Sequence, residues 1–222
     1  MSAEQRLTIE IWSDVVCSWC YVGKRHLESA LAELPDRDAV DLVWRSFELD
    51  PTLPADAGGA DEELARRRGI SHEEARAMHE ETERMGEELG IRFDFARARR
   101  GNTFDAHRVL HMARDEGRQQ EVLERLLSAY FAEGARIGDP AALASSAAEA
   151  GMDEDAVRAM LDAGGYAAAV RADEQEAAML GITAVPFFVI DRRYGLSGAH
   201  PPETIRAAID RAREERARPE AS

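Results

Sequence analysis

A pair of cysteines three positions apart constrains this chain more than any other feature of its sequence. Cys17 and Cys20 are the only cysteines among 222 residues. Residues 7–12, which precede the pair, alternate between apolar and mainly polar side chains, as a half-buried strand does. From residue 22 to residue 34, apolar side chains recur near helical spacing until a proline ends the pattern. We therefore expect the cysteines where a strand passes into the first turn of a helix.

The beginning of a helix favours thiolate chemistry at the first cysteine. Backbone N–H groups there have no partner within the helix, and the helix dipole places its positive end among them. In such a setting the pKa of a cysteine falls from about 8.5 to roughly 3.5–7.5. We assign the nucleophile to Cys17. Cys20 lies one turn deeper, where it can attack a mixed disulfide on Cys17 and release the substrate.

Three other interpretations of the pair are structural. A disulfide that closes a four-residue ring would gain only about 2 kcal/mol from loop entropy, so stability is a poor reason for it. A zinc site wants four ligands, usually with a second close pair, whereas the nearest candidate ligand is the lone His26. Two unrelated buried cysteines would be inert. The spacing favours redox chemistry over all three, and we predict no metal site.

The acidic composition limits the classes of partner. The chain has 43 acidic and 28 basic residues and a formal net charge of −15. Such a charge repels nucleic acid phosphates and anionic membrane surfaces. No stretch approaches the ~20 apolar residues of a membrane span, and the first residues lack the pattern of a signal peptide. We expect a cytoplasmic monomer or homodimer that binds neither nucleic acid nor membranes.

Strand patterns recur at both ends of the chain. Residues 40–47 have apolar side chains on both faces, which is typical of a strand covered on both sides. Residues 50–59 form a loop by composition. Residues 186–190 and 194–197 are predicted to form a hairpin. An amphipathic helix follows, with a charged end from about residue 214 that frays.

Between these strands the pattern is helical from about residue 61 to residue 181. Ser71 with Glu74 is a capping-box signature, and Asp139 before a proline marks another helix start. Thr103 is also expected to cap a helix. The predicted helices span residues 71–90, 103–117, 119–133, 139–151, 153–163 and 166–180.

This order of elements, with a Cys-x-x-Cys motif at its first strand-to-helix junction, resembles the thioredoxin fold carrying a helical insertion. The chain resembles DsbA-like thiol:disulfide oxidoreductases over nearly its whole length, and most closely their cytoplasmic FrnE-like branch. Five segments carry the resemblance: residues 12–25 (WSDVVCSWCYVGKR), 47–51 (FELDP), 102–108 (NTFDAHR), 181–188 (GITAVPFF) and 197–199 (SGA).

The resemblance implies an α/β fold with two parts. Residues 1–60 and 181–222 are expected to form the thioredoxin-like domain. Residues 61–180 would form a large all-helical insertion between the second strand and the C-terminal hairpin. The last helix of the insertion, about residues 166–180, is expected to pack back on the thioredoxin-like domain.

The resemblance also implies further site residues. Val185 and Pro186 match the cis-proline loop that faces the active site in thioredoxin-like proteins, where an extended substrate could pair as an added strand. The alternative is an ordinary proline at the start of an edge strand. Ser18 stands where the family leads us to expect proline, so its effect on the redox potential cannot be taken from relatives. Trp19 is expected to shield the sulfurs and contact substrate, unless it is a core residue.

Residues 102–108 resemble a family segment near the active site. We place Phe104 and His107 there as substrate-binding residues. In the alternative, Phe104 is a core side chain and His107 is a histidine with ordinary hydrogen-bond partners. Four methionines of the helical block read as helix core: Met78, Met85, Met112 and Met160.

The function implied is that of a thiol-disulfide oxidoreductase or isomerase that acts on a protein or small molecule bearing a thiol or disulfide. It would need no cofactor beyond its redox-active disulfide, with glutathione as a candidate co-substrate. Kappa-class glutathione transferases and 2-hydroxychromene-2-carboxylate isomerases share the insertion, but typically carry a single serine or cysteine in place of the pair. The intact pair favours dithiol chemistry. A third alternative is a redox sensor without enzymatic activity.

Overall fold

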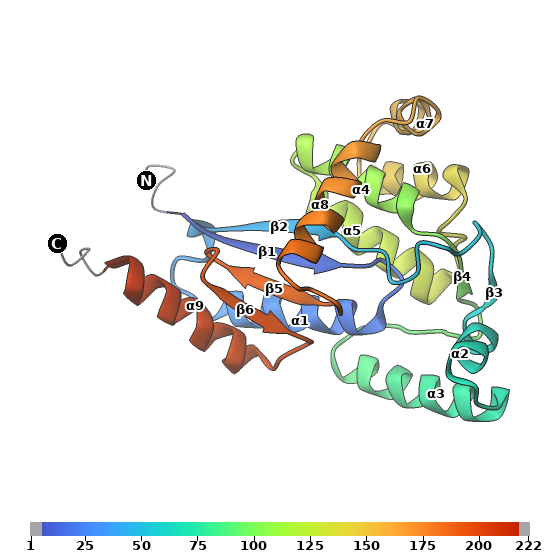
Figure 1. Ribbon diagram of the computed structural model, residues 1–222, viewed down its shortest axis with the longest axis horizontal. Helices are drawn as coiled ribbons and strands as arrows, with labels where there is room; N and C mark the ends of the chain where they lie inside the picture. Colours follow the sequence, from blue (N-terminus) through green and yellow to red (C-terminus); the bar gives the residue numbers. More distant parts are fainter. Residues whose placement is uncertain (1–5, 218–222) are drawn as a thin grey trace.

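A four-stranded mixed sheet lies at the centre of the computed structural model, which describes residues 6–217 (Figure 1). Its strand order is β2-β1-β5-β6. β1 (Leu7–Ser13) runs parallel to β2 (Val40–Ser46) and antiparallel to β5 (Phe187–Ile190). β6 (Tyr194–Ser197) completes the predicted C-terminal hairpin with β5. β1 therefore lies inside the sheet, and the chain leaves its end directly toward the cysteines.

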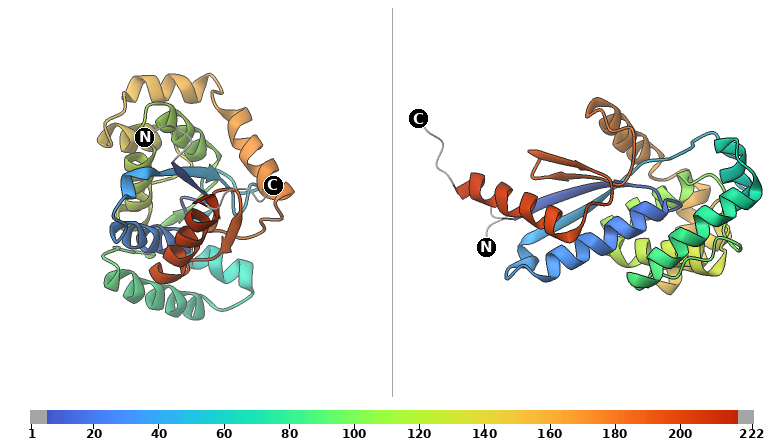
Figure 2. Two further views of the ribbon diagram at one scale, coloured as in Figure 1. Left: turned by 90° about the vertical axis from the view of Figure 1, so that its left-hand side faces the viewer. Right: turned by 90° about the horizontal axis from the view of Figure 1, so that it is seen from below.

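Helices cover both faces of the sheet (Figure 2). α1 (Ser18–Ala32) and α9 (Pro202–Ala217) pack against each other on one face. Leu7, Ile9 and Ile11 belong to the large hydrophobic core that includes inner residues of both helices. α8 (Ala167–Met179) lies on the opposite face, where Trp12 is fully buried in a second, smaller cluster.

The prediction that residues 7–12 form a half-buried strand is wrong in one respect. Glu10 and Trp12, on the face expected to be open, are both buried. α8 causes this burial, because the indole nitrogen of Trp12 donates a hydrogen bond of 3.0 Å to the carbonyl of Asp173 in that helix. A strand pattern alone does not show that a helix whose contact residue lies 161 positions later in the sequence will cover this face.

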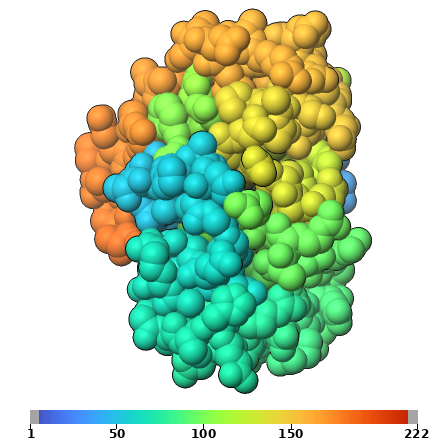
Figure 3. All heavy atoms as spheres, turned by 90° about the vertical axis from the view of Figure 1, so that its right-hand side faces the viewer, coloured from blue at the N-terminus to red at the C-terminus, as the bar shows by residue number. Residues whose placement is uncertain are grey.

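Apart from α8, the insertion between β2 and the hairpin has two groups of helices (Figure 1). One arm consists of α2 (Ala60–Arg68) and α3 (His72–Glu88). The other is a bundle of four helices: α4 (Phe104–Asp115), α5 (Gln119–Ser128), α6 (Pro140–Glu149) and α7 (Glu154–Asp162). A π-helical turn, Ala129–Glu133, continues α5. The insertion forms most of the end of the molecule seen in Figure 3.

The sequence pattern missed a small ribbon within the insertion. β3 (Gly58–Gly59) pairs antiparallel with β4 (Arg99–Arg100) and joins the two arms. The predicted cap at Thr103 is also wrong in detail. Thr103 occupies the cap position without a side-chain capping bond, and the side chain of Asn102 accepts the hydrogen bond from the Phe104 amide instead. The Ser71 and Glu74 capping box is present as predicted.

α1 is attached to the insertion by aromatic and charged contacts. The ring of Tyr21 lies 5.9 Å from that of Phe93 and 6.1 Å from that of Phe131, between centroids. Its hydroxyl donates a 2.6 Å hydrogen bond to Glu124 of α5, which also pairs with Lys24 and Arg25. The helix that carries the cysteines is therefore fixed against both the sheet and the insertion.

Two expectations concern residues at the ends. α9 remains helical to residue 217, beyond the point where a charged, frayed end was predicted, and residues 218–222 lie outside the described part. Residues 1–5, which the prediction about a signal peptide concerns, also lie outside it. No helix among residues 6–217 is long and apolar enough to cross a membrane.

Candidate active site

The two cysteines occupy the first turn of α1 in unequal positions. Cys17 is the N-cap residue with an extended backbone, and Cys20 lies within the helix. The carbonyl of Cys17 accepts hydrogen bonds from the amides of Cys20 and Tyr21. Cys17 is 8% exposed and Cys20 is 1% exposed, and both are free thiols. Cys17 is therefore the more exposed of the two cysteines.

Local interactions separate the acidities of the two thiols. A hydrogen bond from the Cys20 thiol lowers the pKa of Cys17, and the amides of Cys20 and Trp19 act in the same direction against burial and the charge of Asp14. Burial, followed by the interaction with Cys17, raises the pKa of Cys20 well above its usual range. This arrangement favours a thiolate at Cys17 and a protonated thiol at Cys20.

The proline loop reaches Cys17 from the sheet side. The carbonyl of Val185 lies 3.7 Å from the Cys17 sulfur as a hydrogen-bond acceptor. The Val185–Pro186 peptide bond is cis, as predicted. Gly23 allows α1 to approach this loop, because a Cβ there would lie 3.0 Å from Pro186 Cγ and 3.3 Å from Phe188 Cζ.

A cavity of about 180 Å³ opens beside Cys17, between the start of α1 and the α2–α3 arm. Ser18 and Trp19 also line it, and Trp19 is 52% exposed, so it is not a core residue. Met78 lies in the opposite wall with 36% exposure, which corrects its interpretation as helix core. Val185 does not line this cavity, although its carbonyl faces Cys17.

Two side chains from distant segments extend the cavity wall near the cysteines. Arg100 of β4 donates a 3.3 Å hydrogen bond to the carbonyl of Val16. Tyr130, in the π-helical turn, is buried, and this burial raises its pKa to about 12 although Arg100 acts in the opposite direction. The short ribbon and the π-helical turn thus bring polar groups to the neighbourhood of Cys17.

Phe104 and His107 lie near this region but outside the cavity. Phe104 is half-buried at the start of α4, with the guanidinium of Arg171 4.2 Å from its ring centroid. His107 is 2% exposed, and its Nε2 lies 3.5 Å from Oδ1 of Asp14. Burial opposes protonation, yet Asp14 raises the pKa of His107 overall. We had expected His107 to bind substrate, but a histidine buried against a carboxylate is not placed to touch one.

The family follows from a comparison with known sequences. A model described as "DSBA-like thioredoxin domain" matches residues 8–210. The chain belongs to this family. The predicted fold class is thereby confirmed: an α/β thioredoxin-like fold with a helical insertion between β2 and the β5–β6 hairpin.

Individual proteins similar to this chain were also found. The chain is 41% identical to a "probable DsbA oxidoreductase" from Streptomyces coelicolor, with a TM-score of 0.91 covering 98% of this chain and 94% of that one. It is 28% identical to the uncharacterized protein YwbO of Bacillus subtilis, covering 82% of this chain and 86% of the relative. The cytosolic disulfide reductase DsbM of Pseudomonas aeruginosa shares the fold, at 19% identity and a TM-score of 0.62, covering 94% and 99%. By family and structural similarity, the protein is a DsbA-like oxidoreductase.

Sequence reasoning missed several residues of this DsbA-like site. Asp14 lies within the segment that carried the resemblance, only three positions before Cys17, so its position was an available signal. Arg100 and Tyr130 gave no such signal, because they reach the site only through the folding of the insertion. Among residues 6–217, no group of three or more His, Cys, Asp or Glu side chains is arranged to hold a metal ion.

Proposed function

We propose that this DsbA-like protein reduces or isomerises disulfides with Cys17 as the nucleophile and Cys20 as the resolving thiol. The observation that carries the proposal is the unequal placement of the two sulfurs. Cys17 lines the cavity and has a lowered pKa, whereas Cys20 is buried behind it with a raised pKa. An enzyme that works with a single thiol would not need this second, buried sulfur.

The reaction proceeds by two exchanges of sulfur bonds. The Cys17 thiolate attacks one sulfur of the substrate disulfide, the substrate S–S bond breaks, and the first substrate thiolate leaves. Cys20 then loses its proton and attacks the Cys17 sulfur, releasing the second substrate thiolate and forming the Cys17–Cys20 disulfide. Two electrons pass from the dithiol to the substrate, and the protons of the two cysteines end on the released thiols. An external thiol, with glutathione as a candidate, would restore the dithiol.

We also propose the direction of electron flow and a place in the cytoplasmic FrnE-like branch. Related dithiol proteins span about −270 mV (thioredoxin) to about −120 mV (DsbA), against a cytosolic glutathione poise of roughly −220 to −320 mV. Stabilising the Cys17 thiolate stabilises the reduced form, which moves the potential toward the upper end. In the cytoplasm such a protein would rest as the dithiol and act as a reductase or isomerase. Acid trapping and alkylation of the protein from unstressed cells tests this, and a mostly oxidised pair would contradict it.

Two cysteine variants test the assigned roles. Cys17→Ser is expected to abolish reduction of hydroxyethyl disulfide and insulin. Cys20→Ser should retain the first attack and accumulate a mixed disulfide on Cys17, visible in the intact mass. Faster alkylation of Cys20 than of Cys17 by iodoacetamide at pH 6 would reverse the assignment.

The same variants separate the two alternative functions. Full turnover by Cys20→Ser with glutathione would favour a single-thiol enzyme of the glutathione transferase or isomerase type. Absence of disulfide reductase activity in the wild type, with a reversible Cys17–Cys20 couple, would favour a redox sensor. The oligomeric state, monomer or homodimer, affects neither comparison.

A further inference from the structure

Three arginines line the cavity beside Cys17. Arg67 and Arg68 come from the last turn of α2, and Arg100 comes from β4. The preceding Arg66 is paired with Glu63 at 2.7 Å, but within residues 6–217 none of these three has a carboxylate oxygen within 4.0 Å. Their positive charges are therefore not neutralised by ion pairs with the described part of the chain.

Two carboxylates on which the charge of Arg100 acts already have other hydrogen-bond partners. Glu63 receives two hydrogen bonds from Arg66, which is the first cause of its lowered pKa. Asp50 accepts hydrogen bonds from the amide and hydroxyl of Thr52. Arg100 acts on both groups only through its charge. Arg68 Nη1 makes one weak contact with the Met78 sulfur, at 3.9 Å, and Arg100 Nη1 donates to the Val16 carbonyl. The three arginines keep most of their other N–H donors available to a ligand.

Helix stability explains only part of this arrangement. Basic side chains in the last turn of a helix interact favourably with its dipole, which would account for Arg67 and Arg68. It does not account for Arg100, which belongs to a different element and reaches the same cavity. A protein with a net charge of −15 repels anions over most of its surface. An unpaired basic cluster at its reactive thiol is the local exception.

The other side chains of the cavity determine what kind of anion would fit. Trp19, Leu64 and Met78 offer apolar contacts in the same walls. A guanidinium binds a carboxylate through two parallel N–H donors, and this charge-assisted pair is stronger than a neutral hydrogen bond. The volume of about 180 Å³ admits one half of a small disulfide beside Cys17.

We propose that Arg67, Arg68 and Arg100 form a carboxylate-binding subsite that selects small anionic disulfides for attack by Cys17. This inference rests on the proposed function, because the selected bond is the one that Cys17 opens. The ligand class is a disulfide with a carboxylate a few bonds from sulfur and an aliphatic segment between them. The carboxylate would bind the arginines while the aliphatic segment contacts Trp19 and Met78.

Three disulfides of similar size and different charge test the subsite. They are 3,3′-dithiodipropionate (anionic), hydroxyethyl disulfide (neutral) and cystamine (cationic). The measured quantity is the rate at which each converts the reduced wild type into its Cys17–Cys20 disulfide, after acid quenching and mass spectrometry. Each rate is divided by that of the same disulfide with dithiothreitol, which removes differences in intrinsic reactivity. We expect the order anionic, neutral, cationic, with a preference that weakens as salt is added.

The variant Arg67→Gln/Arg68→Gln measures the contribution of two of the arginines. Its ratio of anionic to neutral rates is expected to fall about tenfold for each arginine that binds the carboxylate, because each substitution removes a charge-assisted hydrogen bond. The control Arg158→Gln/Arg206→Gln removes the same charge from an exposed position on α7 and a partly exposed position on α9. It should keep the wild-type ratio.

The outcomes distinguish the subsite from the proposed function. Equal normalised rates for the three disulfides in the wild type would overturn the subsite while leaving the reductase intact. An equal fall in the control variant would show an effect of net charge and would also overturn it. No conversion of the wild type by any disulfide would overturn the proposed function itself, and the subsite with it.

Discussion

Asp14 is a buried carboxylate that acts on the nucleophile from within the active-site segment. Its Oδ2 accepts a 2.8 Å hydrogen bond from the amide of Leu49. Its Oδ1 has no hydrogen-bond partner among the described residues and faces Nε2 of His107 at 3.5 Å. The charge of Asp14 raises the pKa of Cys17, in opposition to the hydrogen bonds from Cys20 and the helix amides. His107 is thus placed to offset this charge when it is protonated.

Removing Asp14 and removing His107 should shift the pKa of Cys17 in opposite directions. Asp14→Asn removes a negative charge, so the pKa of Cys17 should fall and its alkylation at pH 6 should become severalfold faster. His107→Gln removes the compensating cation, so the pKa should rise and alkylation should slow. The pH profile of iodoacetamide labelling at Cys17, resolved by peptide mass spectrometry, measures both. Identical profiles in the wild type and Asp14→Asn would show that Asp14 does not act on Cys17.

Gly23 controls a close approach between α1 and the proline loop. Gly23→Ala would place a methyl group 3.0 Å from Pro186 Cγ, closer than side chains normally pack. We expect a loss of about 1–3 kcal/mol in unfolding free energy, as for overpacking elsewhere. Disulfide reduction should also slow, because the displaced loop carries the Val185 carbonyl near Cys17. Ser29→Ala, at an exposed position of the same helix, is the control for urea unfolding and turnover. Unchanged stability in Gly23→Ala would mean that the loop relaxes without cost.

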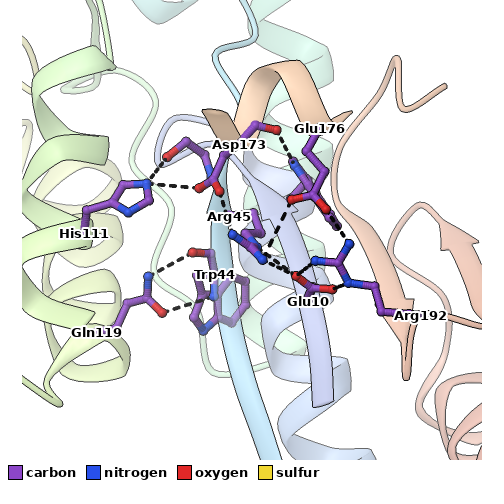
Figure 4. Close-up of polar contacts among 10 residues, drawn as sticks. Glu10, Trp44, Arg45, His111, Gln119, Asp173, Glu176 and Arg192 are labelled. Carbon is purple, nitrogen blue, oxygen red and sulfur yellow. Dashed lines mark hydrogen bonds and ion pairs between the residues drawn. The ribbon is translucent and has the colours of Figure 1, made fainter. Parts of the chain in front are cut away.

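At the scale of elements, α8 is held to the sheet by a polar network around Asp173 (Figure 4). Its carboxylate accepts hydrogen bonds of 2.9 Å from Arg45 Nη1 and from the amide of Ser46, and it lies 3.0 Å from His111 Nε2. Further ion pairs continue the network among Arg45, Glu10, Arg192 and Glu176. Asp173 therefore links α8 to β2 and to α4.

The network makes stability depend on pH in the acidic range. Burial raises the pKa of Asp173, but His111, the Ser46 amide and Arg45 outweigh it, so the pKa lies below the usual value. A carboxyl whose pKa is lower in the folded state stabilises the fold above its unfolded pKa of about 4, and this contribution disappears as pH falls through the folded pKa. The urea concentration at the unfolding midpoint should therefore decrease as the pH is lowered below about 5.

Asp173→Asn should remove part of that acid dependence and cost about 3 kcal/mol at pH 7, since it leaves buried partners uncompensated. Asp162→Asn removes the same charge from an exposed residue of α7 and serves as the control. Urea unfolding of both variants from pH 3 to pH 7, followed by circular dichroism, measures the difference. Parallel pH curves for Asp173→Asn and the wild type would contradict a contribution from this carboxylate.

Across the whole molecule, one hydrophobic core joins the sheet to the insertion. The same cluster contains Ile9 of β1, Leu27 of α1, and Phe93, Leu126 and Val157 of the insertion. α8 adds a second contact through the cluster of Trp12 and Ala177. The division into a thioredoxin-like domain and an insertion, which remains a proposal, therefore does not coincide with a break in packing.

This shared core predicts a single cooperative unfolding transition. Tryptophan fluorescence reports mainly on the sheet and α1, where Trp12, Trp19 and Trp44 lie, whereas far-ultraviolet circular dichroism reports on helices throughout the chain. The two signals should change at the same urea concentration. Two separated midpoints would show that the insertion unfolds independently.

The sequence by itself determined the local features of this protein. Periodicity located the four strands of the central sheet and most helices, and Cys17, Cys20 and Pro186 were recognised from a motif and its family resemblance. These features can be read from a sequence because a turn, a cap or a strand-to-helix junction depends on residues a few positions apart. Residue spacing could also place both thiols at the start of a helix.

Only the tertiary structure decided which distant residues meet at that junction. In the folded chain α8 packs on the second face of β1, Met78 lines the cavity, and Arg100 lies in the same cavity wall as Cys17. The tertiary structure also buried His107 against Asp14, away from the cavity. No local pattern encodes these contacts, because they depend on how separate helices pack against one sheet and on which charges remain unpaired when they do.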